Sequence, residues 1–80
     1  MPIRIITFGA LQDFFEKEFE LEVPAGATGQ DVLTRLSFQN PSAGSILSVC
    51  KIAIAGNLAD PKQTLASESE LFLLPPPSGG

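Results

Sequence analysis

The sequence contains no histidine and a single cysteine, Cys50. Without histidine, the chain lacks a common zinc ligand and the usual general base of a nucleophilic pair, and one cysteine cannot form an internal disulfide. It also lacks a GxxxxGK[ST] loop and a GxGxxG turn, the local signatures of nucleotide phosphate binding. We therefore expect no metal site, no bound cofactor and no catalytic triad.

Basic residues and long apolar runs are also scarce. Five Lys and Arg residues stand against nine Asp and Glu, which gives a net charge of −4. This balance argues against a nucleic-acid surface and favours partners with basic patches. No apolar run approaches membrane-spanning length, and residues 1–12 lack the pattern of a signal peptide. We expect a cytoplasmic protein that binds neither nucleic acid nor membrane.

The composition is that of one small globular domain, with 80 residues of which 44% are apolar. Two stretches, residues 3–8 and 16–23, alternate with the period of two that predicts a strand with one buried face. The expected inward positions are Ile3, Ile5, Thr7, Phe19, Leu21 and Val23. The opposite face of residues 16–23 carries three glutamates, which could contact a basic partner but are more typical of the solvated face of an edge strand.

A helix is predicted to begin at Thr28, because Asp31 follows at the spacing of a capping box. Its apolar stripe would consist of Val32, Leu33 and Leu36 and would lie on the sheet. The helix should end before Asn40-Pro41, since a residue that precedes proline avoids the helical region.

The remaining segments give weaker signals. Residues 9–16 are interpreted as a short helix or loop that packs Leu11, Phe14 and Phe15 inward, and residues 41–45 as a flexible link. Residues 46–49 could be a helical turn or an irregular packed segment. Residues 51–55 should form a central strand, followed by a tight turn at Gly56-Asn57 and another at Asp60-Pro61, with Leu65 in the core.

The end of the chain carries the strongest signal. Residues 71–74 are four large apolar residues in a row, which predicts a strand covered on both faces, and three prolines then prevent further pairing. We therefore divide the chain into a domain, residues 1–74, and a tail, residues 75–80. A polyproline stalk could hold the terminal carboxylate roughly 15 Å from the domain. Gly79 and Gly80 have no Cβ and could enter a narrow slot.

A terminal carboxylate is a stable anion and a poor electrophile, so it must be activated before it can transfer an acyl group. A mixed anhydride formed with ATP would do this. Because the sequence shows no ATP-binding motif, the activating enzyme would have to be another protein.

The final strand with its Pro-Pro-x-x-Gly-Gly ending, residues 71–80, resembles the tail of the small subunit of molybdopterin synthase, the MoaD-type sulfur carriers. Residues 3–11 and 52–57 are similar to that family as well. The resemblance implies an α+β, ubiquitin-like β-grasp fold: a mixed sheet crossed by one main helix, its first and last strands parallel in the centre, with an extended C-terminal Gly-Gly tail.

The same resemblance implies the function of a sulfur carrier in molybdenum cofactor biosynthesis. An E1-like adenylyltransferase would use ATP to adenylate Gly80, and a sulfurtransferase relay would convert the adenylate to a thiocarboxylate. The large subunit of molybdopterin synthase would then receive the tail and pass the sulfur to a pterin precursor. The chain would carry sulfur without being an enzyme itself. The residues implied in threading the tail are Gly79, Ser78, Pro77, Pro76 and Pro75; the third proline departs from the expected two.

Parallel pairing of the first and last strands would also bring Ile6, Phe8, Phe72 and Leu74 together near the tail. We expect partner proteins to dock on this apolar surface, at Phe8, Leu58, Phe72 and Leu74. The alternative is that these side chains pack under loops of the same domain.

Other functions remain open at this point. The carrier could serve thiamine synthesis, cysteine synthesis or tRNA thiolation. The chain could instead be a protein modifier joined to lysines through Gly80, or an interaction module that is never conjugated. Cys50 could hold persulfide sulfur, but a small buried apolar side chain next to a strand is the commoner role of a free cysteine.

Overall fold

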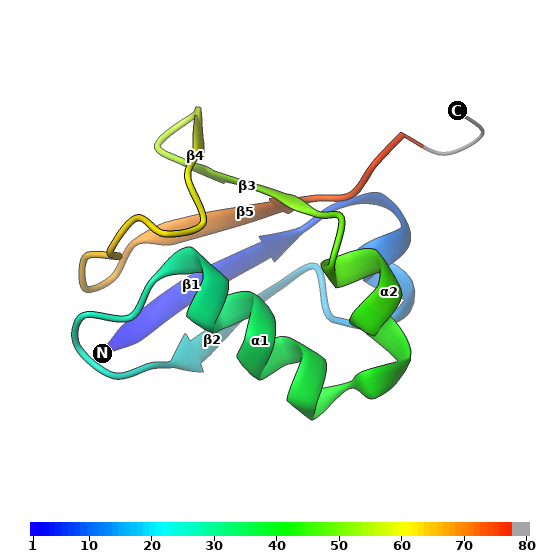
Figure 1. Ribbon diagram of the computed structural model, residues 1–80, viewed down its shortest axis with the longest axis horizontal. Helices are drawn as coiled ribbons and strands as arrows, with labels where there is room; N and C mark the ends of the chain where they lie inside the picture. The colour runs from blue at the N-terminus through cyan, green and yellow to red at the C-terminus, as the bar shows by residue number, and fades with distance from the viewer. Residues whose placement is uncertain (78–80) are drawn as a thin grey trace.

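The computed structural model describes residues 1–77 and forms a mixed five-stranded sheet with helices on one face (Figure 1). The strands, in the spatial order β2-β1-β5-β3-β4, are β1 (Pro2–Thr7), β2 (Glu18–Glu22), β3 (Lys51–Ile54), β4 (Asn57–Ala59) and β5 (Glu70–Leu74). The helices are α1 (Gly29–Gln39) and α2 (Gly44–Leu47), and the 3₁₀ helices are η1 (Gly9–Asp13) and η2 (Pro41–Ala43). This confirms the predicted α+β architecture with one main helix.

The first and last strands lie next to each other in the middle of the sheet. β1 and β5 are parallel, with Arg4 opposite Glu70 and Thr7 opposite Leu73, while the other strand pairs are antiparallel. β2 and β4 form the two edges. The central parallel pair, which the resemblance implied, is therefore confirmed.

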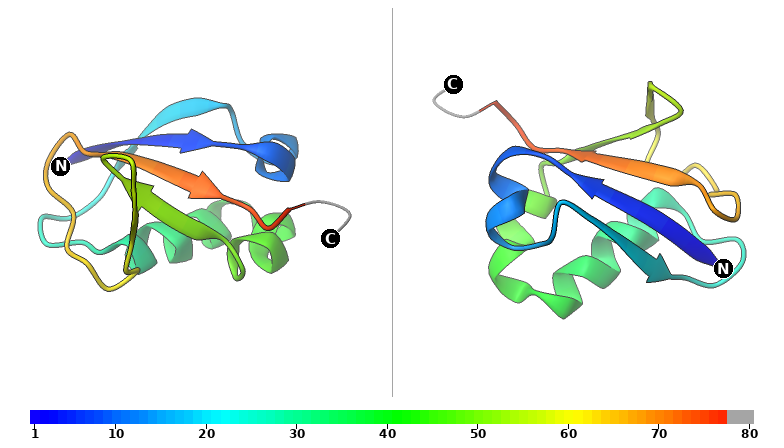
Figure 2. Two further views of the ribbon diagram at one scale, coloured as in Figure 1. Left: turned by 90° about the horizontal axis from the view of Figure 1, so that it is seen from above. Right: turned by 180° about the vertical axis from the view of Figure 1, so that it is seen from behind.

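The hydrophobic core lies between α1 and the inner face of the sheet (Figure 2). Alternate residues of β1 and β5 point into it, as the alternation in β1 predicted, and the apolar stripe of α1 covers them. The fully buried apolar side chains in these elements are Ile3, Ile5, Leu71, Leu73, Val32 and Leu36. Leu65 is also buried, as predicted, and its N–H donates to the carbonyl of Ala27 at 2.9 Å.

The prediction that β5 is covered on both faces is wrong for its outer face. Leu71 and Leu73 are completely buried, but Phe72 and Leu74 on the opposite side are only half-buried. The helices α1 and α2 lie on the inner side of the sheet (Figure 1), so they cover one face only. A row of apolar residues does not distinguish a core face from an apolar surface.

Helix α1 begins with the expected capping box. The N–H of Asp31 donates to the Thr28 hydroxyl at 3.2 Å, and the N–H of Thr28 donates to the Asp31 carboxylate at 2.9 Å. Both bonds satisfy backbone donors that a helix start leaves unpaired. The helix ends at Gln39, just before Asn40-Pro41, as the sequence predicted.

Two connecting segments differ from expectation. Residues 41–45 are not a flexible link, because Pro41 begins η2, Ala43 is fully buried and α2 begins at Gly44. Of residues 46–49, the first two belong to α2 and are therefore helical. Proline suits the first position of a helical turn, because its missing N–H has no partner there anyway. Phe14 does not pack inward but is 36% exposed. η1 ends at Asp13, so its tight turn directs only Leu11 into the core.

The tight turn between β3 and β4 lies one residue earlier than predicted. Ala55 and Gly56 both have positive φ, 53° and 81°, and Ile54 pairs with Asn57. Two residues with positive φ form the type I′ turn that matches the twist of a hairpin. Asn57 is therefore the first residue of β4 and not part of the turn. The expected turn at Asp60-Pro61 is present, with the Asp60 carboxylate accepting from the N–H of Lys62 at 2.8 Å.

We predict that Thr28→Ala lowers the free energy of unfolding by about 1 kcal/mol, because it removes the acceptor of the capping box. Thr34→Ala is the matched control, since Thr34 is exposed in the middle of α1, where alanine is the better helix former. Urea denaturation followed by circular dichroism measures both. Equal stability of the two variants would contradict this role of the capping box.

Candidate docking face and tail

One row of outward-facing apolar side chains runs across four strands of the sheet. Ile6 on β1 lies opposite Phe72 on β5, Phe72 lies opposite Ala53 on β3, and Ala53 lies opposite Leu58 on β4. Residues in register on neighbouring strands have their side chains on the same face. Leu58 at the far end of the row is 67% exposed.

Phe8 and Leu74 extend this row toward the end of the sheet where β5 finishes. The Phe8 ring meets the Phe72 ring edge to face, with centroids 5.9 Å apart, and Phe8 is 42% exposed. Leu74 shares a face with Phe72 because the two are two residues apart in one strand. We call Ile6, Phe8, Leu58, Phe72 and Leu74 the apolar patch. The structure thus places all four predicted docking residues on one face.

The alternative, that these side chains pack under loops of the same domain, does not hold for Phe8 and Leu58, which are 42% and 67% exposed. Ile6, Phe72 and Leu74 are half-buried. Ala53, which the sequence analysis did not single out, fills the row between the two larger side chains. The sequence feature that could have identified this position is the alternation of large and small residues in β3. Ile52 faces the core, and Ala53 faces outward.

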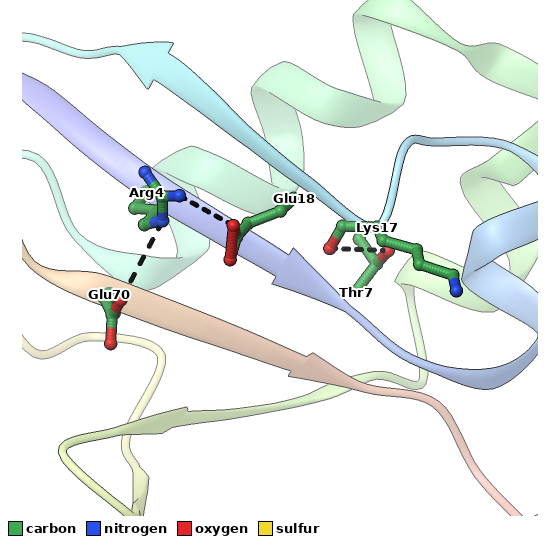
Figure 3. Close-up of polar contacts among 5 residues, drawn as sticks. All are labelled: Arg4, Thr7, Lys17, Glu18 and Glu70. Carbon is green, nitrogen blue, oxygen red and sulfur yellow. Dashed lines mark hydrogen bonds and ion pairs between the residues drawn. The ribbon is translucent and has the colours of Figure 1, made fainter.

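The other half of the outer face is charged (Figure 3). An Arg4 guanidinium nitrogen donates to the Glu18 carboxylate at 2.6 Å, and Arg4 Nε lies 3.9 Å from a Glu70 oxygen. The hydrogen bond and charge of Glu18, with a smaller effect of Glu70, raise the pKa of Arg4 above its ordinary value. All three side chains are about half exposed, so these ion pairs contribute little to stability.

The glutamates of β2 line an exposed edge strand, as the solvated interpretation predicted. Glu18, Glu20 and Glu22 are exposed, and β2 is the outermost strand on its side of the sheet. Glu22 lies 3.4 Å from the N-terminal amino group of Met1. Charged side chains on an edge strand discourage pairing with other chains.

The base of the tail lies at the end of the sheet away from the N-terminus (Figure 1). β5 ends at Leu74, Pro75 is half-buried, and Pro76 and Pro77 are exposed. Pro75 lies beside Gly9, which follows the end of β1 and has a φ of +55°. The predicted roles of Ser78, Gly79 and Gly80 concern positions outside the described residues.

Two further observations concern the described part of the chain only. Among residues 1–77, no helix combines the length and the apolar character that crossing a membrane requires. Within the same range, cysteine and acidic side chains nowhere gather in a group of three or more that could hold a metal ion.

A family model described as the ThiS family matches residues 5–80, nearly the whole chain. The chain belongs to the ThiS family. This confirms the resemblance at the level of the ThiS/MoaD-type ubiquitin-like sulfur carriers. No curated protein matches the sequence.

Solved structures share the fold of this ThiS-family chain. SAMP1 from Haloferax volcanii, a small archaeal modifier protein, superimposes with a TM-score of 0.84 at 22% identity over 100% of both chains. A molybdopterin converting factor subunit 1 from Pyrococcus furiosus gives a TM-score of 0.82 at 17% identity over 94% of this chain and 97% of its own. A chain in the complex of subunits 1 and 2 of molybdopterin-converting factor from Helicobacter pylori gives a TM-score of 0.71 at 23% identity. The match covers 100% of this chain and 100% of that chain. These likenesses confirm the ubiquitin-like β-grasp fold.

Cys50 is the one thiol in this ThiS-family chain, and its surroundings make it a poor sulfur nucleophile. It lies between α2 and β3, half-buried and packed against the core. Burial raises the pKa of the Cys50 thiol, because a thiolate loses hydration there. The group therefore stays protonated at neutral pH, which favours the apolar role over the persulfide role.

We predict that Cys50 in the folded chain reacts with iodoacetamide only at higher pH than in the urea-unfolded chain, because burial raises its pKa in the folded state. By linkage, a raised folded pKa also means that stability falls as pH rises above the pKa of the unfolded thiol. Alkylation rates measured by mass spectrometry against pH test this. A midpoint in the folded chain at or below that of the unfolded chain would contradict the assignment.

Proposed function

We propose that the chain is the sulfur carrier of a molybdopterin synthase, with Gly80 as the residue that bears the sulfur. The observation that carries this proposal is the position of the apolar patch: it lies at the end of the sheet where β5 leads into the Pro-Pro-Pro-Ser-Gly-Gly sequence. A partner that binds Phe8, Phe72 and Leu74 also positions the base of the tail, which directly follows Leu74.

The chemistry follows from the terminal carboxylate. An E1-like adenylyltransferase joins this carboxylate to the α-phosphate of ATP and releases pyrophosphate. Sulfide, or the outer sulfur of a persulfide on a sulfurtransferase, then attacks the acyl carbon; the new C–S bond replaces the C–O bond, and AMP leaves with the electron pair. From a persulfide, a second thiol must cleave the S–S bond, which yields the thiocarboxylate and a disulfide.

The partners supply every catalytic group in this scheme, so the chain is a cosubstrate and subunit and not an enzyme by itself. ATP is bound by the adenylyltransferase, and no cofactor belongs to this chain. The large subunit of molybdopterin synthase receives the tail and passes the sulfur to a pterin precursor. Support comes from the Helicobacter pylori neighbour, which is a complex of subunits 1 and 2 of molybdopterin-converting factor. The proposal includes a cytoplasmic location, because the first step uses ATP.

A second candidate function is protein modification, in which Gly80 is joined to lysines of other proteins. The observation that favours it is the likeness to SAMP1, which is named as a modifier protein. Both functions begin with the same adenylate and differ in the nucleophile that attacks it. A carrier for thiamine synthesis, cysteine synthesis or tRNA thiolation would likewise differ only in the final acceptor.

The first test is the mass of the intact chain after incubation with the adenylyltransferase of the same organism, ATP and inorganic sulfide. We expect a gain equal to the exchange of one oxygen for sulfur, and no gain in a chain that lacks Gly80. Loss of the sulfur when the large subunit and a pterin precursor are added would identify the acceptor. No gain with an active adenylyltransferase would contradict the carrier function, and adducts on lysines in a cell extract would favour modification.

The apolar patch gives a second test. Leu58→Asp should weaken binding to the large subunit roughly 30-fold or more, because it introduces a charge into the apolar patch at an exposed position. Phe38→Asp is the matched control, since Phe38 is 82% exposed but lies on α1, outside the patch. Isothermal titration calorimetry measures both. Equal affinities of the two variants would show that the patch is not the docking surface.

A further inference from the structure

Gly9 occupies a position that admits no other residue without a local shift. Its φ of +55° lies in the left-handed region, which side chains with a Cβ rarely adopt. A Cβ built on Gly9 would lie 3.1 Å from Cγ of Pro75, which is closer than an ordinary van der Waals contact. Two independent features, the backbone angle and the proximity of Pro75, therefore favour glycine here.

The pairing of the two central strands explains why Gly9 meets the tail. β1 and β5 run parallel and end at the same edge of the domain, with Thr7 opposite Leu73. The backbone continues by two residues after Thr7 and by two residues after Leu73, which brings Gly9 next to Pro75. Phe8, just before Gly9, is the patch residue whose ring contacts Phe72.

The turn that contains Gly9 is held in place from both sides. The Gln12 side-chain amide donates to the carbonyl of Thr7 at 3.0 Å, across the turn. The buried Thr7 hydroxyl donates to the carbonyl of Glu16 at 2.8 Å and lies within 3.5 Å of that of Lys17 (Figure 3). Leu11, in η1, is completely buried. These contacts hold the backbone of Gly9 in a fixed position, and Pro75 packs against it.

Pro75 is the point at which the direction of the tail is set. It is half-buried, whereas Pro76 and Pro77 are exposed, so it is the last of the prolines with substantial contact to the domain. Proline has a fixed φ, and consecutive prolines form a stiff segment. A small rotation at Pro75 therefore changes the direction of Pro76 and Pro77.

We propose that Gly9 is a positioning residue for the C-terminal tail: by lacking a Cβ, it lets Pro75 pack against the turn after β1, and this contact directs the tail relative to the apolar patch. The proposal rests on the proposed function, since it concerns delivery of Gly80 to an activating enzyme or a large subunit. Gly9 touches no reacting atom and acts through Pro75.

The test compares Gly9→Ala with Gly26→Ala. Gly26 has a φ of +87° and no neighbouring atom within 4 Å of a built Cβ, so this control carries the same kind of backbone strain without the contact. We expect both variants to lower the melting temperature to a similar degree. Only Gly9→Ala should reduce kcat of adenylation by the activating enzyme, by roughly 10- to 100-fold, because the reacting carboxylate is misplaced. Its KM should stay unchanged, since the patch is intact.

A rescue variant separates positioning from general damage. Pro75→Ala removes the Cγ that the new Cβ would meet. In Gly9→Ala/Pro75→Ala, kcat should therefore return to the value of Pro75→Ala alone, which is the coupling expected of residues in contact. Equal kcat in Gly9→Ala and Gly26→Ala, or no recovery in the double variant, would overturn the proposal.

A measurement on the isolated chain tests the contact between Gly9 and Pro75 independently of the proposed function. Nuclear Overhauser effects between the Hα protons of Gly9 and the Hγ protons of Pro75 should be present in the unmodified chain and in Gly26→Ala, and weakened in Gly9→Ala. Their absence from the unmodified chain would overturn the contact itself. If they are present but an active adenylyltransferase modifies none of the chains, the proposed function is wrong, and the delivery role of Gly9 is overturned with it.

Discussion

The parallel pairing of β1 with β5 is the interaction on which the rest of this structure depends. Parallel neighbours cannot be joined by a hairpin, so almost the whole chain between Thr7 and Glu70 serves as their connection. That connection supplies α1, which covers the inner face, and the edge strands β2 and β4. The same pairing makes both central strands end at one edge of the domain, where Phe8 and Leu74 meet the base of the tail.

The two faces of the central strands have different functions. Leu71 and Leu73 point inward and hold α1 on the sheet, whereas Phe72 and Leu74 point outward into the apolar patch. A small domain has little apolar surface to spare, so residues left on an open face of the sheet indicate an interaction surface. The chain combines this surface with a tail and contains no histidine, and burial raises the pKa of its one thiol. These features fit the proposed function, in which partners bind the chain and perform the chemistry.

Charge divides the outer face into two regions. The apolar patch lies over β1, β5 and β4, and the glutamates of β2 lie beside it, with Arg4 between Glu18 and Glu70. Glu18 is in register with Ile6, so the charged region begins directly next to the apolar one. An acidic border of this kind adds orientation and a faster encounter with a basic partner more than it adds affinity.

Local patterns in the sequence determined β1, β2, β3, β5 and the main helix. Alternation fixed the inward faces of β1 and β2, Thr28 and Asp31 fixed the start of α1, and the prolines fixed the end of β5, because each signal depends on residues a few positions apart. Only the tertiary structure decided that Phe72 and Leu74 remain half-exposed, that Phe14 turns outward, and that Gly9 lies against Pro75. These features depend on which strands pair and which face the helix covers. Such contacts join distant parts of the chain, and no local periodicity encodes them.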